Sequence, residues 1–115
     1  MALKFMDNEK GNAYYLNKII FDIEFIIAHT NGKTQKEIES NPLLIDSIMF
    51  RLIQIYENYS KLTEDFKSTY EEVPWRAIKG MRNRIVHDYG VINLDIVYNV
   101  VTNSIPELYK ILKPN

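Results

Sequence analysis

The chain has 115 residues, of which 46% are hydrophobic and 25% charged, and its formal net charge is −1. This composition is typical of one globular domain and excludes a disordered chain, while the near-zero charge excludes a protein that binds nucleic acid through a general positive field. The absence of cysteine excludes thiolate metal sites and cysteine nucleophiles. No apolar run approaches the roughly 20 residues of a membrane span, and MALKFMDNEK lacks an apolar signal core, so we expect a cytoplasmic protein with no membrane contact.

The first expected helix covers residues 12–30. Its apolar residues recur at steps of three and four, which predicts one apolar face: Leu16, Ile19, Ile20, Ile23, Ile26 and Ile27. Asn31 and Gly32 are typical residues for ending a helix. In the polar connector that follows, Thr34 is placed to cap one short helical turn.

A second long helix is expected over residues 42–62, with Asn41 as its N-cap and Pro42 at its first position. Its apolar residues cover more than one face, because Leu44 and Ile53 widen the stripe. A helix that is apolar over so much of its surface needs two surfaces to pack against. We therefore expect a second copy of the chain to cover one of them.

The third helix is expected over residues 75–89. Pro74 suits a first-turn position, and Glu71 and Glu72 complement the positive end of the helix dipole. The preceding stretch TEDFKSTYEEVP is interpreted as a polar loop.

Gly90 is a natural stop for that helix, and Asn93 is placed to cap a last helix over residues 94–112. Pro106 inside this last helix must kink it or split it in two. No segment alternates with a period of two over a useful length, so no sheet is expected. We therefore expect residues 1–115 to form a single domain, an all-α up-down bundle of four main helices with a kinked last helix.

The segment GMRNRIVHDYG collects the polar side chains that mark a candidate site. On a helical wheel with about 100° per residue, Arg82, Asn83, His87 and Tyr89 share one broad face, and Tyr89 falls about 20° from Arg82. Arg82 lies in the middle of the apolar arc of the helix. It must therefore find a carboxylate, extend to solvent, or line a cleft at an interface.

Each of these residues also has a purely structural interpretation. Arg82 would pair with Glu57, the carboxylate embedded in the otherwise uncharged LIQIYENYS of the second helix. His87 would be a satisfied histidine near a helix end, and Tyr89 a half-buried tyrosine with its hydroxyl in water. The sharing of one face by a cation, an imidazole and a phenol favours a functional site instead.

Charge supports the functional interpretation. No acidic residue occurs from Val73 to His87, whereas four positive side chains do: Arg76, Lys79, Arg82 and Arg84. This stretch is a local anion-attracting surface in a chain of net charge −1. Arg84 and Asp88 lie on the opposite face, one turn apart, and are expected to form a solvated pair.

The string RNRIVHDY matches the Arg-x4-His-x-Tyr signature of the HepT-like branch of the HEPN superfamily, which the chain resembles. Arg82, His87 and Tyr89 supply this signature, and Asn83 fits because a polar residue commonly follows the arginine. The segments VPWRAIKGMRNRIVHDYGVINLDIVYNVV and IPELYKIL look like the third and fourth helices of that family. The resemblance therefore covers nearly the whole chain.

The resemblance implies a metal-independent ribonuclease that acts as the toxin of a toxin–antitoxin pair, with a minimal nucleotidyltransferase as its antitoxin partner. His87 would act as general base or acid, Arg82 would clamp phosphate oxygens, and Asn83 would orient phosphate or ribose. No metal or cofactor is implied. In similar proteins the partner transfers AMP onto the tyrosine of the motif, which implies silencing through Tyr89.

A homodimer is also implied, because one histidine per site leaves the second proton transfer without an agent. A two-fold dimer would bring two copies of Arg82 and His87 into one cleft. One departure bears on its geometry: the family usually has Gly-Glu-Ala where this chain has Tyr56-Glu57-Asn58. The alternative is a non-catalytic homodimeric module that binds a nucleotide or docks on the nucleotidyltransferase, which the near-neutral charge favours.

Overall fold

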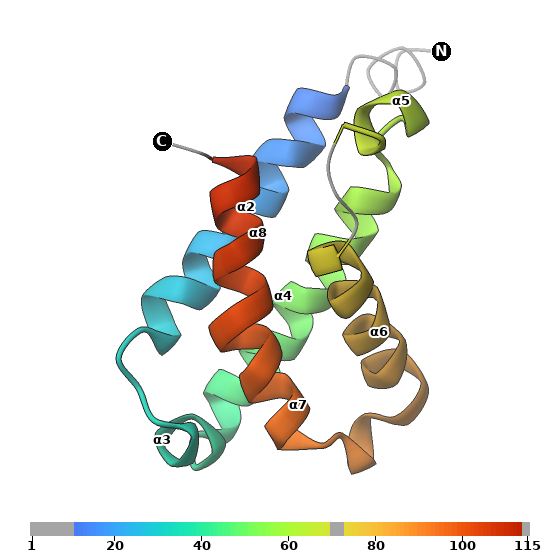
Figure 1. Cartoon of the computed structure of the whole chain (residues 1–115). Coiled ribbons are helices and arrows are strands. Elements are labelled where there is room, and N and C mark those ends of the chain that lie inside the picture. Colours follow the sequence, from blue (N-terminus) through green and yellow to red (C-terminus); the bar gives the residue numbers. More distant parts are fainter. Residues whose placement is uncertain (1–10, 70–72, 114–115) are drawn as a thin grey trace, which may run out of the picture.

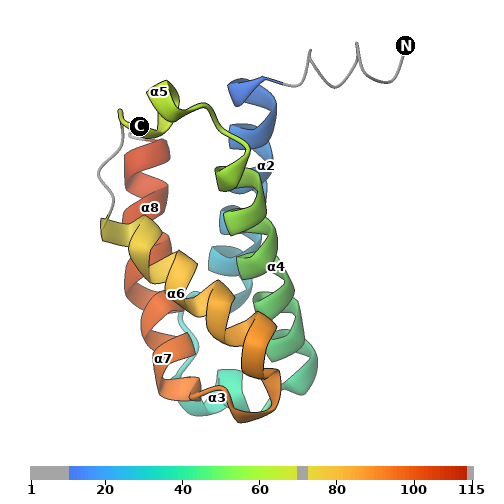
Figure 2. The same cartoon turned by 90° about the vertical axis from the view of Figure 1, so that its right-hand side faces the viewer.

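The computed structural model describes residues 11–69 and 73–113, and the regular elements in these ranges are all helical (Figure 1). The main segments are α2 (Asn12–Thr30), α4 (Pro42–Ser60), α6 (Val73–Asp88) and a last one made of α7 (Leu94–Asn99), the π-helical turn η2 (Val100–Ser104) and α8 (Ile105–Leu112). Shorter elements join them: α3 (Gln35–Glu39), α5 (Glu64–Lys67) and the 3-10 turn η1 (Tyr89–Val91). The main segments alternate in direction, which confirms the expected all-α up-down bundle (Figure 2).

The predicted helix boundaries rest on local hydrogen bonds that the structure contains. Thr34 forms a capping box with Glu37, in which Thr34 Oγ1 accepts from the Glu37 N–H at 3.1 Å and the Glu37 carboxylate accepts from the Thr34 N–H at 2.8 Å. Asn41 Oδ1 accepts from the Leu44 N–H at 3.1 Å. Gly32 follows α2 with a φ of 77°, a conformation that glycine adopts without strain. These boundaries were therefore determined locally.

One connection differs from expectation. The predicted polar loop contains α5, which begins after Thr63 because Thr63 Oγ1 accepts from the Phe66 N–H at 3.3 Å. Glu71 and Glu72, expected near the start of α6, lie outside the described residues. No helix in the described ranges is long and apolar enough to span a membrane.

The last helical segment is split, as Pro106 required. Proline has no N–H to donate to the residue four positions earlier, and the wider turn η2 lies directly before α8, in whose first turn Pro106 sits. The break lets both halves keep an apolar side toward the core. Val97 and Leu108 are accordingly 1% and 0% exposed.

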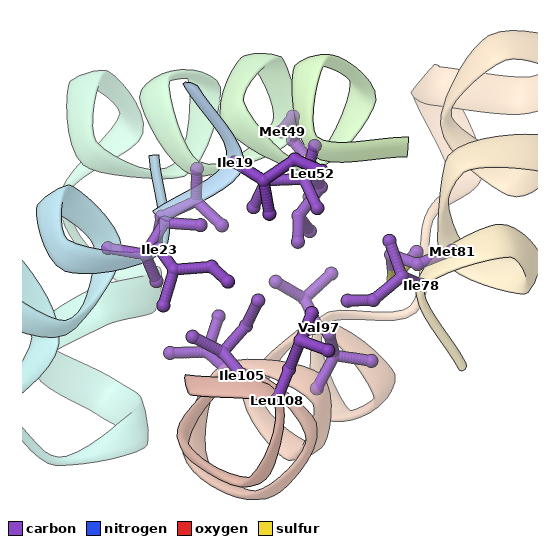
Figure 3. Close-up of a cluster of buried hydrophobic side chains, with 14 of the residues drawn as sticks. Ile19, Ile23, Met49, Leu52, Ile78, Met81, Val97, Ile105 and Leu108 are labelled. Atoms are coloured by element: carbon purple, nitrogen blue, oxygen red, sulfur yellow. The ribbon is translucent and has the colours of Figure 1, made fainter. Parts of the chain in front are cut away.

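One hydrophobic core joins the four main segments (Figure 3). Each segment contributes side chains that are at most 2% exposed: Ile19 and Ile23 from α2, Met49 and Leu52 from α4, Ile78 and Met81 from α6, and Val97, Ile105 and Leu108 from the last segment. Burial of these side chains is the main stabilising term of the bundle.

An ion pair connects α2 to one side of α4. Asp22 Oδ1 accepts from Arg51 Nη1 at 2.6 Å, and the Arg51 guanidinium lies 3.8 Å from the centre of the Phe25 ring. The Asp22 and Arg51 side chains are only 10% and 21% exposed. This side of α4 is therefore occupied by α2, and α6 also packs against α4.

Candidate active site

Packing of α6 against α4 positions the candidate residues. Trp75 in the first turn of α6 stacks on Tyr59 of α4 with ring centroids 3.9 Å apart and an interplanar angle of 20°. Ile78, Met81 and Ile85 follow on the same side of α6 and are buried. Arg82 is adjacent to this apolar row and faces the flank of α4.

Arg82 is held by Glu57, as its structural interpretation predicted. Glu57 Oε2 accepts from Arg82 Nη2 at 2.8 Å and from Nε at 3.2 Å. The Arg82 guanidinium also lies 5.5 Å from the centre of the Tyr56 ring. The two charged side chains are 28% and 41% exposed, so the pair lies at the surface and not in the core.

The pairing leaves part of the guanidinium free to bind a ligand. Arginine has five N–H donors. Glu57 takes one from Nε and one from Nη2, and Asn83 Oδ1 takes one from Nη1 at 3.0 Å. Among the described residues, one donor on each Nη therefore has no partner, and either can donate to a phosphate oxygen.

Asn83 and His87 are placed differently from each other. Asn83 is partly buried and its side-chain oxygen positions Arg82. His87 is exposed and has no hydrogen bond to another described residue. Five residues of helix separate it from Arg82, which is about 7.5 Å of rise and about 140° of rotation. A single chain therefore carries both groups on one helix without enclosing them in one cleft.

Tyr89 is not part of the α-helix that the helical-wheel analysis assumed for it. The α-helix ends at Asp88, whose φ of −157° breaks the register, and Tyr89 begins the 3-10 turn η1. Its hydroxyl donates a hydrogen bond to Asp46 Oδ1 of α4, and this bond, with some burial and the Asp46 charge, raises the pKa of Tyr89 above its usual value. Tyr89 is 48% exposed.

The placement of Tyr89 about 20° from Arg82 on one continuous helix is therefore wrong. Asp46 and Glu57 are eleven residues apart on α4, which is about 16 Å along the helix axis. Tyr89 and Arg82 contact opposite ends of that interval. Asp46 is a partner that the sequence interpretation missed, and its only signal was an acidic residue within the apolar stretch LLIDSIMF of α4.

An exposed surface, which we name the α4–α6 flank, connects the two contacts. Asp46, Phe50, Ile53 and Glu57 follow one another on α4 at steps of four, three and four, and Tyr89, Val86 and Arg82 run alongside them in the antiparallel direction. Phe50 and Val86 are 58% and 51% exposed. Each helix thus exposes an apolar side chain at a position between its two polar contacts.

The wide apolar surface predicted for α4 is present, but other residues form it. Leu44 is 8% exposed and belongs to the core, and Ile53 is partly buried against it. Leu43 and Phe50, at 81% and 58%, are the apolar side chains that α4 exposes. The difference arises because Leu44 and Ile53 pack into or against the core of the bundle, whereas Leu43 and Phe50 do not.

Two remaining residues of α6 form no part of this arrangement. Arg84 and Asp88 are both exposed and make no ion pair within the described residues, so the solvated pair expected between them is absent. The described residues also contain no group of three or more His, Asp or Glu side chains placed to hold a metal ion.

Known proteins with similar sequences are ribonuclease-like. A family model described as "Ribonuclease HepT-like" matches residues 19–114. A protein named "Putative RNase" from Caldanaerobacter subterraneus subsp. tengcongensis is 31% identical over 99 residues, which cover 86% of this chain and 88% of that protein. A "Probable ribonuclease HepT" from Thermococcus cleftensis is 30% identical over 105 residues, covering 87% and 91%. No solved structure matches the chain at a significant level.

Proposed function

The chain belongs to the HepT-like ribonuclease family, and on that premise we propose that it is a metal-independent endoribonuclease and the toxin of a toxin–antitoxin pair. Its antitoxin partner is a minimal nucleotidyltransferase. Arg82 and His87 carry out the cleavage, in a cleft between two copies of the chain.

The main support for this proposal is the way in which the Arg82 side chain is held. Glu57 and Asn83 hold the guanidinium on two sides and leave one donor on each Nη for a phosphate. An arginine positioned in this way binds a phosphodiester without further ordering, and it stabilises the charge that develops on the phosphorane.

RNA carries its own nucleophile, so the protein has only to move protons and stabilise charge. The 2′-hydroxyl attacks the adjacent phosphorus as a base removes its proton, and the P–O5′ bond breaks as an acid protonates the leaving 5′-oxygen. The products are a 2′,3′-cyclic phosphate and a 5′-hydroxyl. His87 is exposed and can serve as either base or acid.

Two proton transfers need two groups, and a homodimer supplies them. Phe50 of α4 and Val86 of α6 are exposed apolar side chains at sequence positions between the residues of the Arg82–Glu57 and Tyr89–Asp46 contacts. A second copy that packs on these side chains about a two-fold axis buries them and adds a second His87 near the first. One His87 then acts as the base and the other as the acid.

Cleavage of an unpaired RNA oligonucleotide in the presence of a chelator tests the proposal. Wild type is expected to cut it, and His87→Ala and Arg82→Ala are each expected to lower the rate at least about a hundredfold, because each removes a group that acts on the reacting atoms. Circular dichroism of each variant is the control for folding. A His87→Ala protein that cuts at the wild-type rate would contradict the assignment.

The non-catalytic alternative keeps one specific support. The net charge of −1 makes the general attraction of RNA weak. A weak attraction of RNA is expected of a module that only docks on a nucleotidyltransferase or presents a nucleotide to it. The same assay decides between the two. Absence of cleavage by wild type, with a stable complex between the chain and the nucleotidyltransferase, would establish the binding module.

Silencing by AMP transfer to Tyr89 completes the proposal. The Tyr89 oxygen would attack the α-phosphorus of ATP and release pyrophosphate, and the phenol proton would pass to Asp46, which already accepts a hydrogen bond from it. The added phosphodiester brings bulk and negative charge to the α4–α6 flank, near His87.

Coexpression with the partner tests this step. Wild type is expected to gain the mass of one or more AMP units and to lose activity in proportion. Tyr89→Phe is expected to remain an active nuclease that escapes silencing. Full inhibition of Tyr89→Phe by the partner would show that inhibition works by occlusion.

A further inference from the structure

A groove between α4 and α6 lies next to Arg82 and is not explained by the cleavage chemistry. It has a volume of about 220 Å³ and is lined by Tyr56 and Tyr59 from α4 and by Trp75, Arg76 and Lys79 from α6. Pockets for drug-sized ligands run from roughly 300 to 1,000 Å³. The groove therefore suits one planar ring system and not a whole cofactor.

Aromatic rings form its floor. Trp75 is 3% exposed and stacks on Tyr59, and the Tyr56 and Tyr59 ring centroids are 6.1 Å apart at an interplanar angle of 40°. The floor is rigid, because Trp75 is fixed by the core. The indole N–H of Trp75 is buried without an acceptor among the described residues, and an unsatisfied buried donor is often found at functional sites.

Positive side chains form its rim and connect it to Arg82. Arg76, Lys79 and Arg82 follow one another on α6 at steps of three residues, or about 4.5 Å of rise each. Tyr56 joins the two features, because its ring centre lies 5.5 Å from the Arg82 guanidinium carbon. A ligand that contacts Arg82 through a phosphate can thus reach the groove with an adjacent ring.

Aromatic rings beside a row of cations are the combination by which proteins bind single-stranded nucleic acid. The rings stack on bases and the cations follow the phosphates. A base in a duplex cannot reach such a groove, because its faces are covered by its neighbours.

We propose that this groove is a subsite for one unpaired RNA base next to the scissile phosphate, with Tyr56 as the stacking residue and Lys79 as the contact to the adjoining phosphate. The subsite rests on the ribonuclease function proposed above. The subsite would make the nuclease prefer single-stranded RNA. It would also supply local attraction for RNA, which the chain does not provide through a general positive charge.

Binding measurements with a matched pair of variants test the subsite. Lys79→Ala and Lys110→Ala each remove one exposed lysine from a helix, the first at the groove rim and the second on α8. Both are made in the His87→Ala background, and binding of a fluorescent unpaired oligonucleotide is followed by anisotropy at several salt concentrations. Lys79→Ala is expected to make the negative slope of log K against log salt shallower by about 0.7, as the loss of one single-strand phosphate contact does, and Lys110→Ala to leave the slope unchanged.

A second variant tests stacking. Tyr56→Leu keeps an apolar side chain but removes the ring, and is expected to raise the dissociation constant for the unpaired oligonucleotide about tenfold, with a much smaller effect on a duplex of the same length. Equal binding of duplex and single strand by the His87→Ala protein, or unchanged affinity and salt slope in both groove variants, would overturn the subsite.

The two proposals fail in different ways. If wild type cuts RNA and the groove variants bind and cut as wild type does, the subsite is wrong and the nuclease function stands. If wild type binds unpaired RNA through Lys79 and Tyr56 but never cuts it, the subsite stands and the nuclease function is wrong.

Discussion

Glu57 offers the sharpest test of why Arg82 is positioned as it is. Two of the five guanidinium donors bind Glu57 Oε2, at 2.8 and 3.2 Å. Glu57→Gln keeps an oxygen that can accept these bonds, whereas Glu57→Ala removes it. If Glu57 acts by orienting Arg82, only the alanine variant should lose activity.

The burial of the pair sets the expected effect on stability. With side chains 28% and 41% exposed, the ion pair is largely solvated, so either variant is expected to lower the free energy of unfolding by at most about 1 kcal/mol. That change corresponds to a drop of roughly 4 °C in Tm for a domain of this size. Both variants are therefore expected to be folded at the temperature of the assay.

The expected effect on cleavage is larger. A misplacement of about 1 Å in a positioning group can cost on the order of a hundredfold in rate, which equals about 2.7 kcal/mol. We expect Glu57→Ala to lower the single-turnover rate of RNA cleavage by tenfold to a hundredfold and Glu57→Gln to change it less than about threefold. The rates are measured with an unpaired oligonucleotide and chelator, and stability is measured by urea unfolding.

Asp22 provides the matched control, because its pair with Arg51 has the same chemistry in a more buried setting, with side chains 10% and 21% exposed. Asp22→Ala is expected to lower the free energy of unfolding by about 3 kcal/mol, because it breaks a buried ion pair. The fraction of this variant that remains folded is expected to cut RNA at the wild-type rate. A Glu57→Ala protein that cuts at the wild-type rate would refute the orienting role. Loss of folding in Glu57→Ala alone would show that the pair holds the bundle together.

Three further predictions concern the rest of the molecule. Asp46→Asn is expected to move the tyrosinate absorbance titration of Tyr89 toward lower pH, because the Asp46 hydrogen bond and charge raise the pKa of Tyr89 above its ordinary value of 10.0. The stability that this hydrogen bond contributes is present below pH 10.0 and is lost as the pH rises through the raised pKa. An unmoved titration would contradict the contact. Leu52→Ala is expected to lower the free energy of unfolding by about 2 to 5 kcal/mol in urea titrations, since Leu52 is 0% exposed, and a loss below 1 kcal/mol would be inconsistent with its place in the core. Phe50→Glu is expected to convert a dimer into a folded monomer by light scattering at micromolar concentration, whereas Lys110→Glu on α8 is not; a Phe50→Glu dimer would place the interface elsewhere.

The sequence by itself determined the helices and most of their ends. Thr34, Asn41 and Asn93 cap the helices that follow them, and Pro106 splits the last segment. These effects depend on a few neighbouring residues and on the preferences of their backbones, so they could be predicted without a fold. The periodicity of the isoleucines likewise predicted the core face of α2.

The sequence also identified Arg82 and its partner, because a charge on an apolar arc next to another helix has few alternatives. Glu57 was the one carboxylate in its stretch of α4, and the structure joins the two. The sequence could not show that the ion pair stays partly exposed, since its exposure depends on how far apart α4 and α6 lie.

Only the tertiary structure decided where Tyr89 lies. The helical wheel placed it beside Arg82, but α6 ends one residue earlier and the chain turns Tyr89 toward Asp46, on another helix and 43 positions away. The exposure of Leu43 and Phe50 in place of Leu44 and Ile53 was decided in the same way, by which helices cover α4. The physical reason is common to both cases: a local pattern fixes the conformation of a segment, while the packing of distant segments selects which of its side chains meet a partner and which remain in solvent.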